Sequence, residues 1–167
     1  MYKMTPKLQK QYEELILNMQ KKTFQSGGGK PPAMLIESAN KNKESLKDEY
    51  FQLLSVEIEK IKKLYNALNE DNYKDDLRII YNLLHEIRGQ AGTFDYILLS
   101  HVANEACILL TTLFKGGSQK FEVSKHLFGI FFRSLLLVYD KGPKACFGAE
   151  DKQLVASLQK VRLKFEE

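Results

Sequence analysis

A histidine followed on the same helical face by two glycines is the part of this sequence whose residue types and spacing best suit chemistry. Residues 85–94 read His-Glu-Ile-Arg-Gly-Gln-Ala-Gly-Thr-Phe. At about 100° per residue, Gly89 and Gly92 lie within about 40° of His85, and the apolar residues of the segment centre about 130° away from it. Each glycine costs a helix roughly 1 kcal/mol relative to alanine. We therefore expect an exposed imidazole beside a surface that carries no side chains.

An exposed neutral imidazole can accept a phosphoryl group, because the lone pair of its unprotonated ring nitrogen is a nucleophile. Arg88 stands three residues after His85. Residues three apart are helix neighbours and a guanidinium pairs well with phosphate, so Arg88 can reach back to the oxygens of an acquired phosphoryl group. Gln90 is a second candidate for contact with that group. The two glycines would let a partner approach closely enough for in-line transfer.

A reactive imidazole normally needs a hydrogen-bond acceptor at its other nitrogen. If the next helix runs antiparallel to that of His85, its nearest polar residues are Asn104 and Glu105, which either orient the imidazole or face solvent. His101 and His126 have neither glycines beside them nor a basic residue three positions on. We interpret both as ordinary surface or boundary histidines.

This pattern resembles the histidine-phosphotransfer (HPt) domains of two-component signalling, with a hydrophobe at +2, a base at +3, glycine at +4 and a small-residue run to an aromatic. The run from Ala91 to Phe94 is most similar to the amino-terminal phosphotransfer domain of chemotaxis histidine kinases. The resemblance implies that His85 is a phosphoacceptor that relays phosphoryl groups to or from receiver-domain aspartates. The implied partners are a response-regulator receiver domain and a histidine kinase or hybrid kinase. The chain itself would need no cofactor, because the Mg²⁺ of this chemistry belongs to the receiver.

Three positions differ from the family pattern. Arg88 replaces the usual lysine at +3, Asp95 the usual glycine at +10, and Cys107 a polar or acidic residue often found near +22. These differences favour an alternative, in which the chain is a helical-bundle interaction module that binds a receiver or another signalling partner without carrying phosphate.

The sequence contains no nucleotide-binding signature, neither GxxxxGK[ST] nor GxGxxG after a strand. The run Gly27–Lys30 is followed by prolines rather than Ser or Thr. We therefore expect a phosphorelay intermediate that receives its phosphoryl group, not an enzyme with a kinase domain. Cys107 and Cys146 lack CxxC spacing, which predicts reduced thiols and no metal site.

Bulk composition is that of an ordinary globular protein, with 167 residues, 44% hydrophobic, 28% charged and a net charge of +4. The basic residues are scattered, so a nucleic-acid partner is not favoured. The longest apolar stretch, Leu127–Tyr139, is interrupted by Arg133 and falls short of the roughly 20 residues that a membrane span needs. The first residues lack the apolar core of a signal peptide. These features predict a cytoplasmic protein that does not contact a membrane.

The chain divides by pattern into three parts. Residues 1–25 predict an amphipathic helical arm, which starts at Thr5-Pro6 and offers an apolar stripe through which a homodimer is possible. Residues 26–43 contain three glycines and two prolines and predict a flexible linker, since proline opposes helix. Residues 44–167 predict the main helical domain.

Apolar residues recur every three or four positions through the main domain, which predicts helices at about 44–69, 72–92, 97–114, 122–140 and 149–165. Asp95 is expected to cap the third of these. The fourth is apolar nearly all round and should be the most buried. Short turns between long helices favour an all-α, antiparallel up-down four-helix bundle with an additional C-terminal helix and an N-terminal helical arm.

Overall fold

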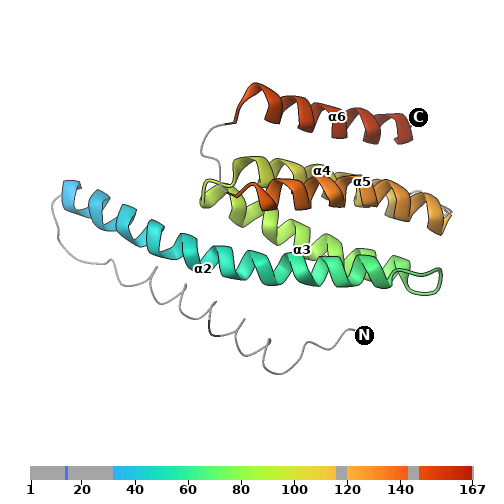
Figure 1. Ribbon diagram of the computed structural model, residues 1–167, viewed down its shortest axis with the longest axis horizontal. Helices are drawn as coiled ribbons and strands as arrows, with labels where there is room; N and C mark the ends of the chain where they lie inside the picture. The colour runs from blue at the N-terminus through green and yellow to red at the C-terminus, as the bar shows by residue number, and fades with distance from the viewer. Residues whose placement is uncertain (1–13, 15–31, 116–119, 143–146, 167) are drawn as a thin grey trace. The chain divides into compact units, whose positions relative to one another are not determined.

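The computed structural model describes Glu14 and residues 32–115, 120–142 and 147–166. Over these ranges the regular structure is helical, as predicted, and neighbouring helices run mostly antiparallel (Figure 1). The helices are α2 (Pro32–Ala67), α3 (Tyr73–Thr93), α4 (Ile97–Lys115), α5 (Phe121–Asp140) and α6 (Ala149–Glu166). The expected boundaries of α3 to α6 agree with these bounds to within a residue or so.

The chain forms two compact units, residues 1–56 and 57–167, and the boundary between them falls within α2. In the described part of the first unit, α2 carries the buried side chains Leu46, Tyr50, Leu53 and Leu54. The second unit contains the end of α2 and all of α3 to α6, and it holds the candidate site.

Helix α2 begins at Pro32, whereas the sequence predicted a flexible linker over 26–43 and a helix from about residue 44. The helical assignment of residues 32–43 corrects that prediction. Proline is well tolerated in the first turn of a helix, because the backbone N–H that it lacks would have no helical acceptor there. Residues 26–31 and the predicted arm, apart from Glu14, lie outside the described residues. The three-part domain division and the homodimer therefore stay predictions.

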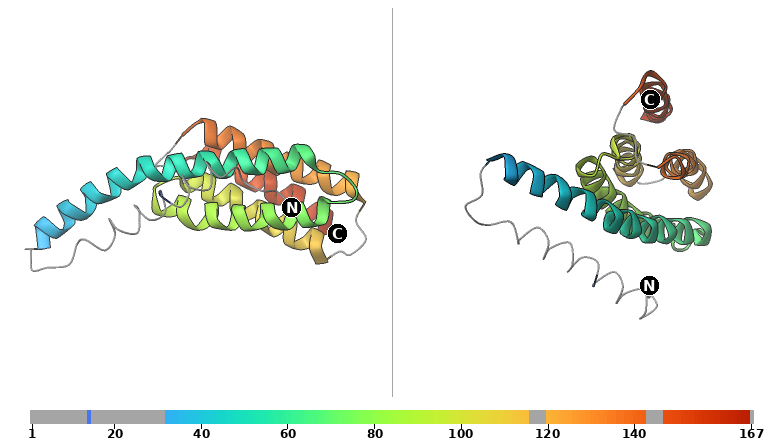
Figure 2. Two further views of the ribbon diagram at one scale, coloured as in Figure 1. Left: turned by 90° about the horizontal axis from the view of Figure 1, so that it is seen from below. Right: turned by 60° about the vertical axis from the view of Figure 1, so that its left-hand side comes forward.

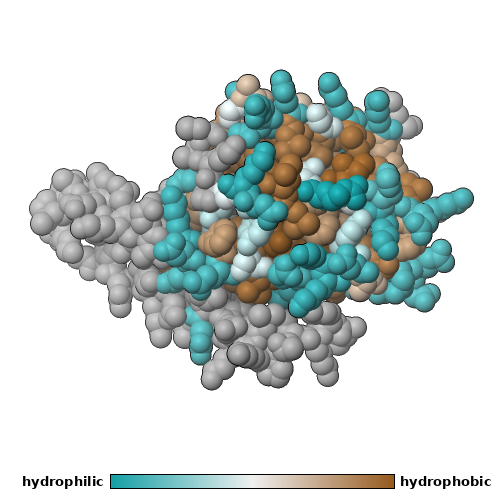
Figure 3. Space-filling view, in the orientation of Figure 1, coloured by the Kyte–Doolittle hydropathy of each residue, from teal (hydrophilic) through white to brown (hydrophobic). Residues whose placement is uncertain are grey.

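Helix α4 is the centre of the second unit, because it contacts α3, α5 and α6 (Figures 1 and 2). It contributes ten buried residues, against seven for α5. The prediction that 122–140 would be the most buried helix is therefore wrong. Composition agrees with this order, because α4 is the more apolar of the two helices. Helix α5 leaves Val123 and Leu137 exposed, while α4 is covered by three neighbouring helices. The space-filling view shows apolar surface over α5 and α6 on the face seen in Figure 1 (Figure 3).

By length and composition α4 is apolar enough to cross a membrane, and it is alone in this among the described helices. In its most apolar window, 56% of the residues are buried inside the protein. A helix at the centre of a protein core has the same properties.

The apolar stripe predicted for α3 is confirmed, and it fixes the direction of His85. The stripe residues are all buried, namely Leu77, Ile80, Leu84, Ile87, Ala91 and, just beyond the helix, Phe94. Since these side chains face the core, the side of α3 that carries His85 faces outward.

Helix α3 ends in a tight turn built around Asp95. The N–H of Phe94 donates to the carbonyls of Gln90 and Ala91, and that of Tyr96 donates to Ala91 at 2.9 Å. Asp95 between them has φ 67°, the left-handed conformation that glycine adopts most easily at the end of a helix. Asp95 therefore belongs to the end of α3, and Tyr96 stands directly before α4. The expected role of Asp95 in capping α4 stays a prediction.

The end of α2 packs on α5 within the second unit. The ring of Tyr65 lies 4.9 Å from that of Phe132 and 5.9 Å from that of Phe128, between centroids. Gly129 lies beside Tyr65. A Cβ atom at residue 129 would collide with the Tyr65 hydroxyl. In addition, the Lys125 ammonium donates to the carbonyl of Leu68 at 3.0 Å. This close approach of two helices explains why residue 129 is a glycine.

Candidate functional site

His85 lies on the exposed side of α3, as predicted, and the surface beside it is open. A Cβ atom built on Gly89 would have no described neighbour within 4 Å. One built on Gly92 would meet the Ser100 hydroxyl at 3.8 Å, which is an ordinary contact. Packing within the described protein therefore requires neither glycine to lack a side chain. The prediction that they leave room for a partner is consistent with this geometry and stays a prediction.

Arg88 binds the imidazole directly. Its Nη2 atom lies 2.8 Å from Nε2 of His85. A guanidinium has only donors, so Nε2 must accept this hydrogen bond with its lone pair. The neutral ring then carries its proton on Nδ1. Nε2 is thus the nitrogen with nucleophilic character, and in this structure its lone pair is engaged by the arginine.

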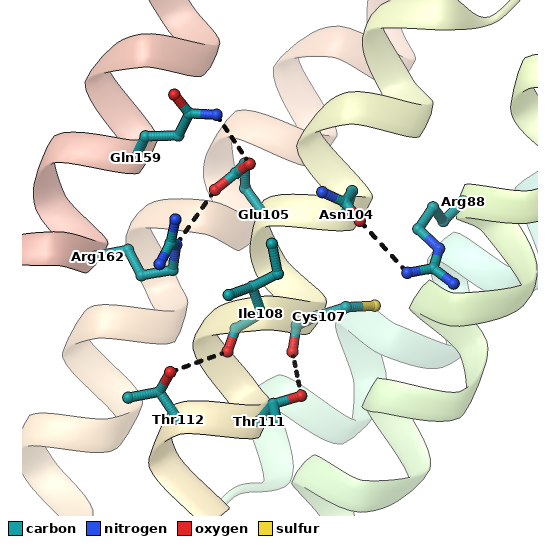
Figure 4. A network of polar contacts seen from close by, with 9 residues as sticks. All are labelled: Arg88, Asn104, Glu105, Cys107, Ile108, Thr111, Thr112, Gln159 and Arg162. Carbon is teal, nitrogen blue, oxygen red and sulfur yellow. Dashed lines mark hydrogen bonds and ion pairs between the residues drawn. The ribbon is translucent and has the colours of Figure 1, made fainter. Parts of the chain in front are cut away.

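Asn104 approaches the site from α4, but it contacts the arginine rather than the imidazole. Its Oδ1 accepts a hydrogen bond from Nη1 of Arg88 at 3.3 Å (Figure 4). The hydroxyl of Ser100, also on α4, donates to the backbone carbonyl of Arg88 at 2.7 Å. Both ends of the Arg88 residue are therefore tied to α4. The predicted antiparallel neighbour does supply a polar group, although its direct partner is Arg88 and not His85.

Glu105 points to the opposite side of α4 from Asn104, towards α6 (Figure 4). It is 4% exposed, and its two oxygens accept from Nε2 of Gln159 at 3.0 Å and from Nε of Arg162 at 3.3 Å. It therefore neither faces solvent nor orients the imidazole of His85, and both expectations are corrected. The physical reason is that α6 covers this side of α4 and brings a cation to the carboxylate.

Gln90 is partly buried, and its Oε1 atom is buried without a hydrogen-bond partner among the described residues. It stands five residues after His85, about 140° around the helix. This placement gives no support to contact between that oxygen and a phosphoryl group on His85, and the predicted role stays untested.

Tyr81 is a neighbour of His85 that the sequence reasoning missed. Its ring centroid lies 6.2 Å from that of the imidazole and 6.2 Å from that of Phe114 on α4. The available signal was its position four residues before His85, which puts an aromatic side chain on the same helical face. Tyr81 is partly exposed and extends the site as an apolar surface towards α4.

Cys107 occupies the position where the HPt pattern often has a polar or acidic residue, and here it is an inert thiol. It is 3% exposed, and burial raises its pKa to about 11, although the charge of Arg88 acts in the opposite direction. A thiol with so high a pKa is protonated at neutral pH. Cys146 lies outside the described residues.

An unusual carboxyl group on α2 interacts with Glu86, the residue that follows His85 on α3. Glu57 on α2 is fully buried, and its pKa is raised from 4.5 to about 8, first by desolvation and second by the charge of Glu86. Burial is the main cause, and a side-chain hydrogen bond with Glu86 raises the pKa of Glu57 further. At neutral pH this carboxyl is mostly protonated.

The other histidines are exposed and lie apart from the Arg88 network, as predicted. His101 packs its ring 4.8 Å from that of Phe147, between centroids, and His126 is on α5. Within the part of the chain that the structure describes, no group of three or more His, Cys, Asp or Glu residues is arranged to hold a metal ion.

Comparisons of the chain with protein-family models, curated proteins and solved structures found no match. Any functional conclusion therefore depends on the geometry around His85: one exposed imidazole, one arginine on its lone pair, and two glycines that no described contact requires.

Proposed function

We propose that the protein is a histidine-containing phosphotransfer protein that accepts a phosphoryl group on His85 and relays it to or from receiver-domain aspartates. The observation that carries the proposal is the exposed imidazole whose Nε2 lies 2.8 Å from a guanidinium. That group would meet the oxygens of a phosphoryl group bound at the same nitrogen. The two glycines beside His85 add support, because they lower helix stability without serving any described contact.

The transfer step uses the lone pair of Nε2. It attacks the phosphorus of an aspartyl phosphate on the receiver, so that an N–P bond forms while the P–O bond to aspartate breaks. The electron pair of that bond leaves on the aspartate carboxylate. The proton on Nδ1 stays on the ring during the attack, and the positive charge on the imidazole is lost when this proton passes to solvent. Transfer in the other direction reverses these steps.

Arg88 would stabilise the phosphoryl oxygens, and the partner would supply the rest of the chemistry. In receiver domains an acidic pocket holds Mg²⁺, so the basic Arg88 and the open surface at Gly89 suit an acidic partner. The chain itself would need no cofactor, and it would act in the cytoplasm between a histidine kinase or hybrid kinase and a response regulator. In this proposal the end of α2 with α3, α4 and α5 forms an up-down four-helix bundle, to which α6 is appended.

Phosphoryl labelling tests the proposal directly. The full chain is incubated with a phosphorylated receiver domain and, separately, with phosphoramidate, and acid-labile phosphate is measured. We expect a label that is lost in His85→Gln and retained in His101→Gln and His126→Gln, which change the other exposed histidines. If His85→Gln takes up as much label as the wild type, His85 is not the phosphoacceptor.

The second candidate is an interaction module that binds a receiver or another signalling protein without carrying phosphate. Two observations favour it: the lone pair of Nε2 is already engaged by Arg88, and Cys107 places an unreactive thiol where HPt domains often have a polar or acidic residue. Binding of a receiver domain with equal affinity by the wild type and His85→Gln, with no label on either, would support this alternative.

A further inference from the structure

We infer that Asn104 is a positioning residue, which holds the guanidinium of Arg88 against Nε2 of His85 before transfer and keeps it beside the phosphoryl group afterwards. The inference rests on the proposed function and deepens it. Asn104 does not touch the reacting atoms, and it acts only through Arg88.

The fork of the guanidinium makes this arrangement possible. Nη1 donates to Asn104 Oδ1 at 3.3 Å while Nη2 lies 2.8 Å from Nε2 of His85, so the two contacts use different nitrogens and exist together. The planar group fixes the angle between them. A long arginine side chain otherwise samples many rotamers, and a second contact at its head restricts them.

The backbone of Arg88 is tied to the same helix as its side chain. Ser100 Oγ donates to the Arg88 carbonyl at 2.7 Å, and Asn104 stands one turn further along α4. The position of the guanidinium therefore depends on the packing of α3 against α4 and not on the rotamer of an isolated surface side chain. Asn104 itself is partly buried between these helices.

Attack by Nε2 requires Nη2 to leave the lone pair. With Nη1 held by Asn104, a small rotation of the guanidinium suffices, and the same nitrogen then meets the phosphoryl oxygens that replace it at Nε2. Without Asn104, the arginine would leave the imidazole more readily before transfer and would hold the phosphoryl group less tightly afterwards. Two separate properties should change together: the tautomer of resting His85 and the lifetime of the phosphohistidine.

The tautomer is measured by NMR of the full chain with ¹⁵N-labelled histidine, and no phosphate is needed. In the wild type we expect His85 with Nδ1 protonated and Nε2 as acceptor. In Asn104→Ala we expect a mixture of tautomers at His85. Asn66→Ala, which removes an exposed asparagine from α2, is the matched control and should keep the wild-type ring signals.

Phosphohistidine lifetime is the second measurement. Loss of a hydrogen bond that positions a charged group predicts decay roughly threefold or more faster in Asn104→Ala than in the wild type. Asn104→Asp keeps an acceptor oxygen at the same position and should restore slow decay. The phosphohistidine of Asn66→Ala should decay at the wild-type rate.

Wild-type tautomer and lifetime in Asn104→Ala would overturn the inference while leaving His85 as phosphoacceptor. If the wild type takes up no label, the proposed function is wrong, and the ring signals alone still decide whether Asn104 positions Arg88. Should Asn104→Ala unfold, Asn104→Leu provides the same decision, because leucine keeps a side chain of similar size and removes the acceptor oxygen. An unchanged tautomer and lifetime in a folded Asn104→Leu protein would then refute the inference.

Discussion

Replacing Glu57 by glutamine removes an ionisable group from the protein interior while keeping the size and shape of the side chain. The carboxyl is fully buried, and its pKa is raised from 4.5 to about 8, mainly by desolvation. The folded protein thus holds this proton more tightly than the unfolded chain does. Consequently, the free energy of unfolding falls as the pH rises from about 4.5 through about 8, which is opposite to the usual behaviour of a paired carboxylate.

The size of the effect follows from the pKa, since each unit of pKa corresponds to roughly 1.4 kcal/mol. At pH 7 the free energy of unfolding of the wild type is about 3 kcal/mol lower than that of a protein with a permanently neutral group at this position. Above pH 8 this difference approaches about 5 kcal/mol. Glutamine is neutral throughout. Glu57→Gln should therefore match the wild type near pH 4 and exceed its stability by about 3 kcal/mol at pH 7.

Urea unfolding followed by far-ultraviolet circular dichroism at several pH values between 4 and 9 measures this difference. Using the difference between two proteins cancels the titration of the other groups. Glu59→Gln is the control, because that side chain is 57% exposed on the same helix and its replacement should change stability by less than about half a kcal/mol at any pH. If the difference in the free energy of unfolding between Glu57→Gln and the wild type is the same at every pH in this range, residue 57 does not carry a buried protonated carboxyl.

Three further substitutions and one labelling experiment test other parts of the structure. Gly89→Ala should raise the free energy of unfolding by about 1 kcal/mol, because its Cβ meets nothing described, and should slow phosphoryl transfer from a receiver; urea unfolding and labelling rates measure the two effects. Asp95→Gly should stabilise by up to about 1 kcal/mol in thermal unfolding, because the residue has φ 67°. Cys107 should react with iodoacetamide at pH 8 at least about 100-fold more slowly in the folded than in the urea-unfolded protein, as read by peptide mass spectrometry, since its pKa is about 11. Arg162→Ala leaves the buried Glu105 carboxylate without its cation and should cost about 3 kcal/mol, with faster hydrogen exchange in α6.

Features that depend on local pattern were predictable from the sequence. The stripe of α3 follows from apolar residues at intervals of three and four, and the same pattern predicts that His85 faces outward. That Arg88 lies beside His85 followed equally from helix periodicity, because the two residues are three apart, whereas its direct contact with Nε2 was not predicted. The start of α2 did not follow from the pattern, since Pro32 and the glycines before it indicate a linker and a helix start equally well.

Features that depend on which helices meet were not predictable. Asn104 and Glu105 are adjacent in the sequence and both polar, yet one faces Arg88 on α3 and the other Arg162 on α6 (Figure 4). Choosing between them requires the packing of three helices around α4. The burial of Glu57 has the same origin, because periodicity shows that a glutamate can lie on an inward face but not that its charge is removed there.

Two glycines on different helices differ in whether packing inside the protein explains them. Gly129 has a described reason to be glycine, because Tyr65 occupies the space that a Cβ would need. Gly89 has none, although a glycine in a helix interior lowers stability by about as much at either position. A residue that costs stability and serves no described contact is expected where something outside the fold must approach. Gly89 follows Arg88 in the chain and stands one turn from His85, so the surface beside it is where we expect a partner to make contact. Substitution at Gly89 should therefore affect transfer between proteins far more than labelling by phosphoramidate, which is too small to require that surface.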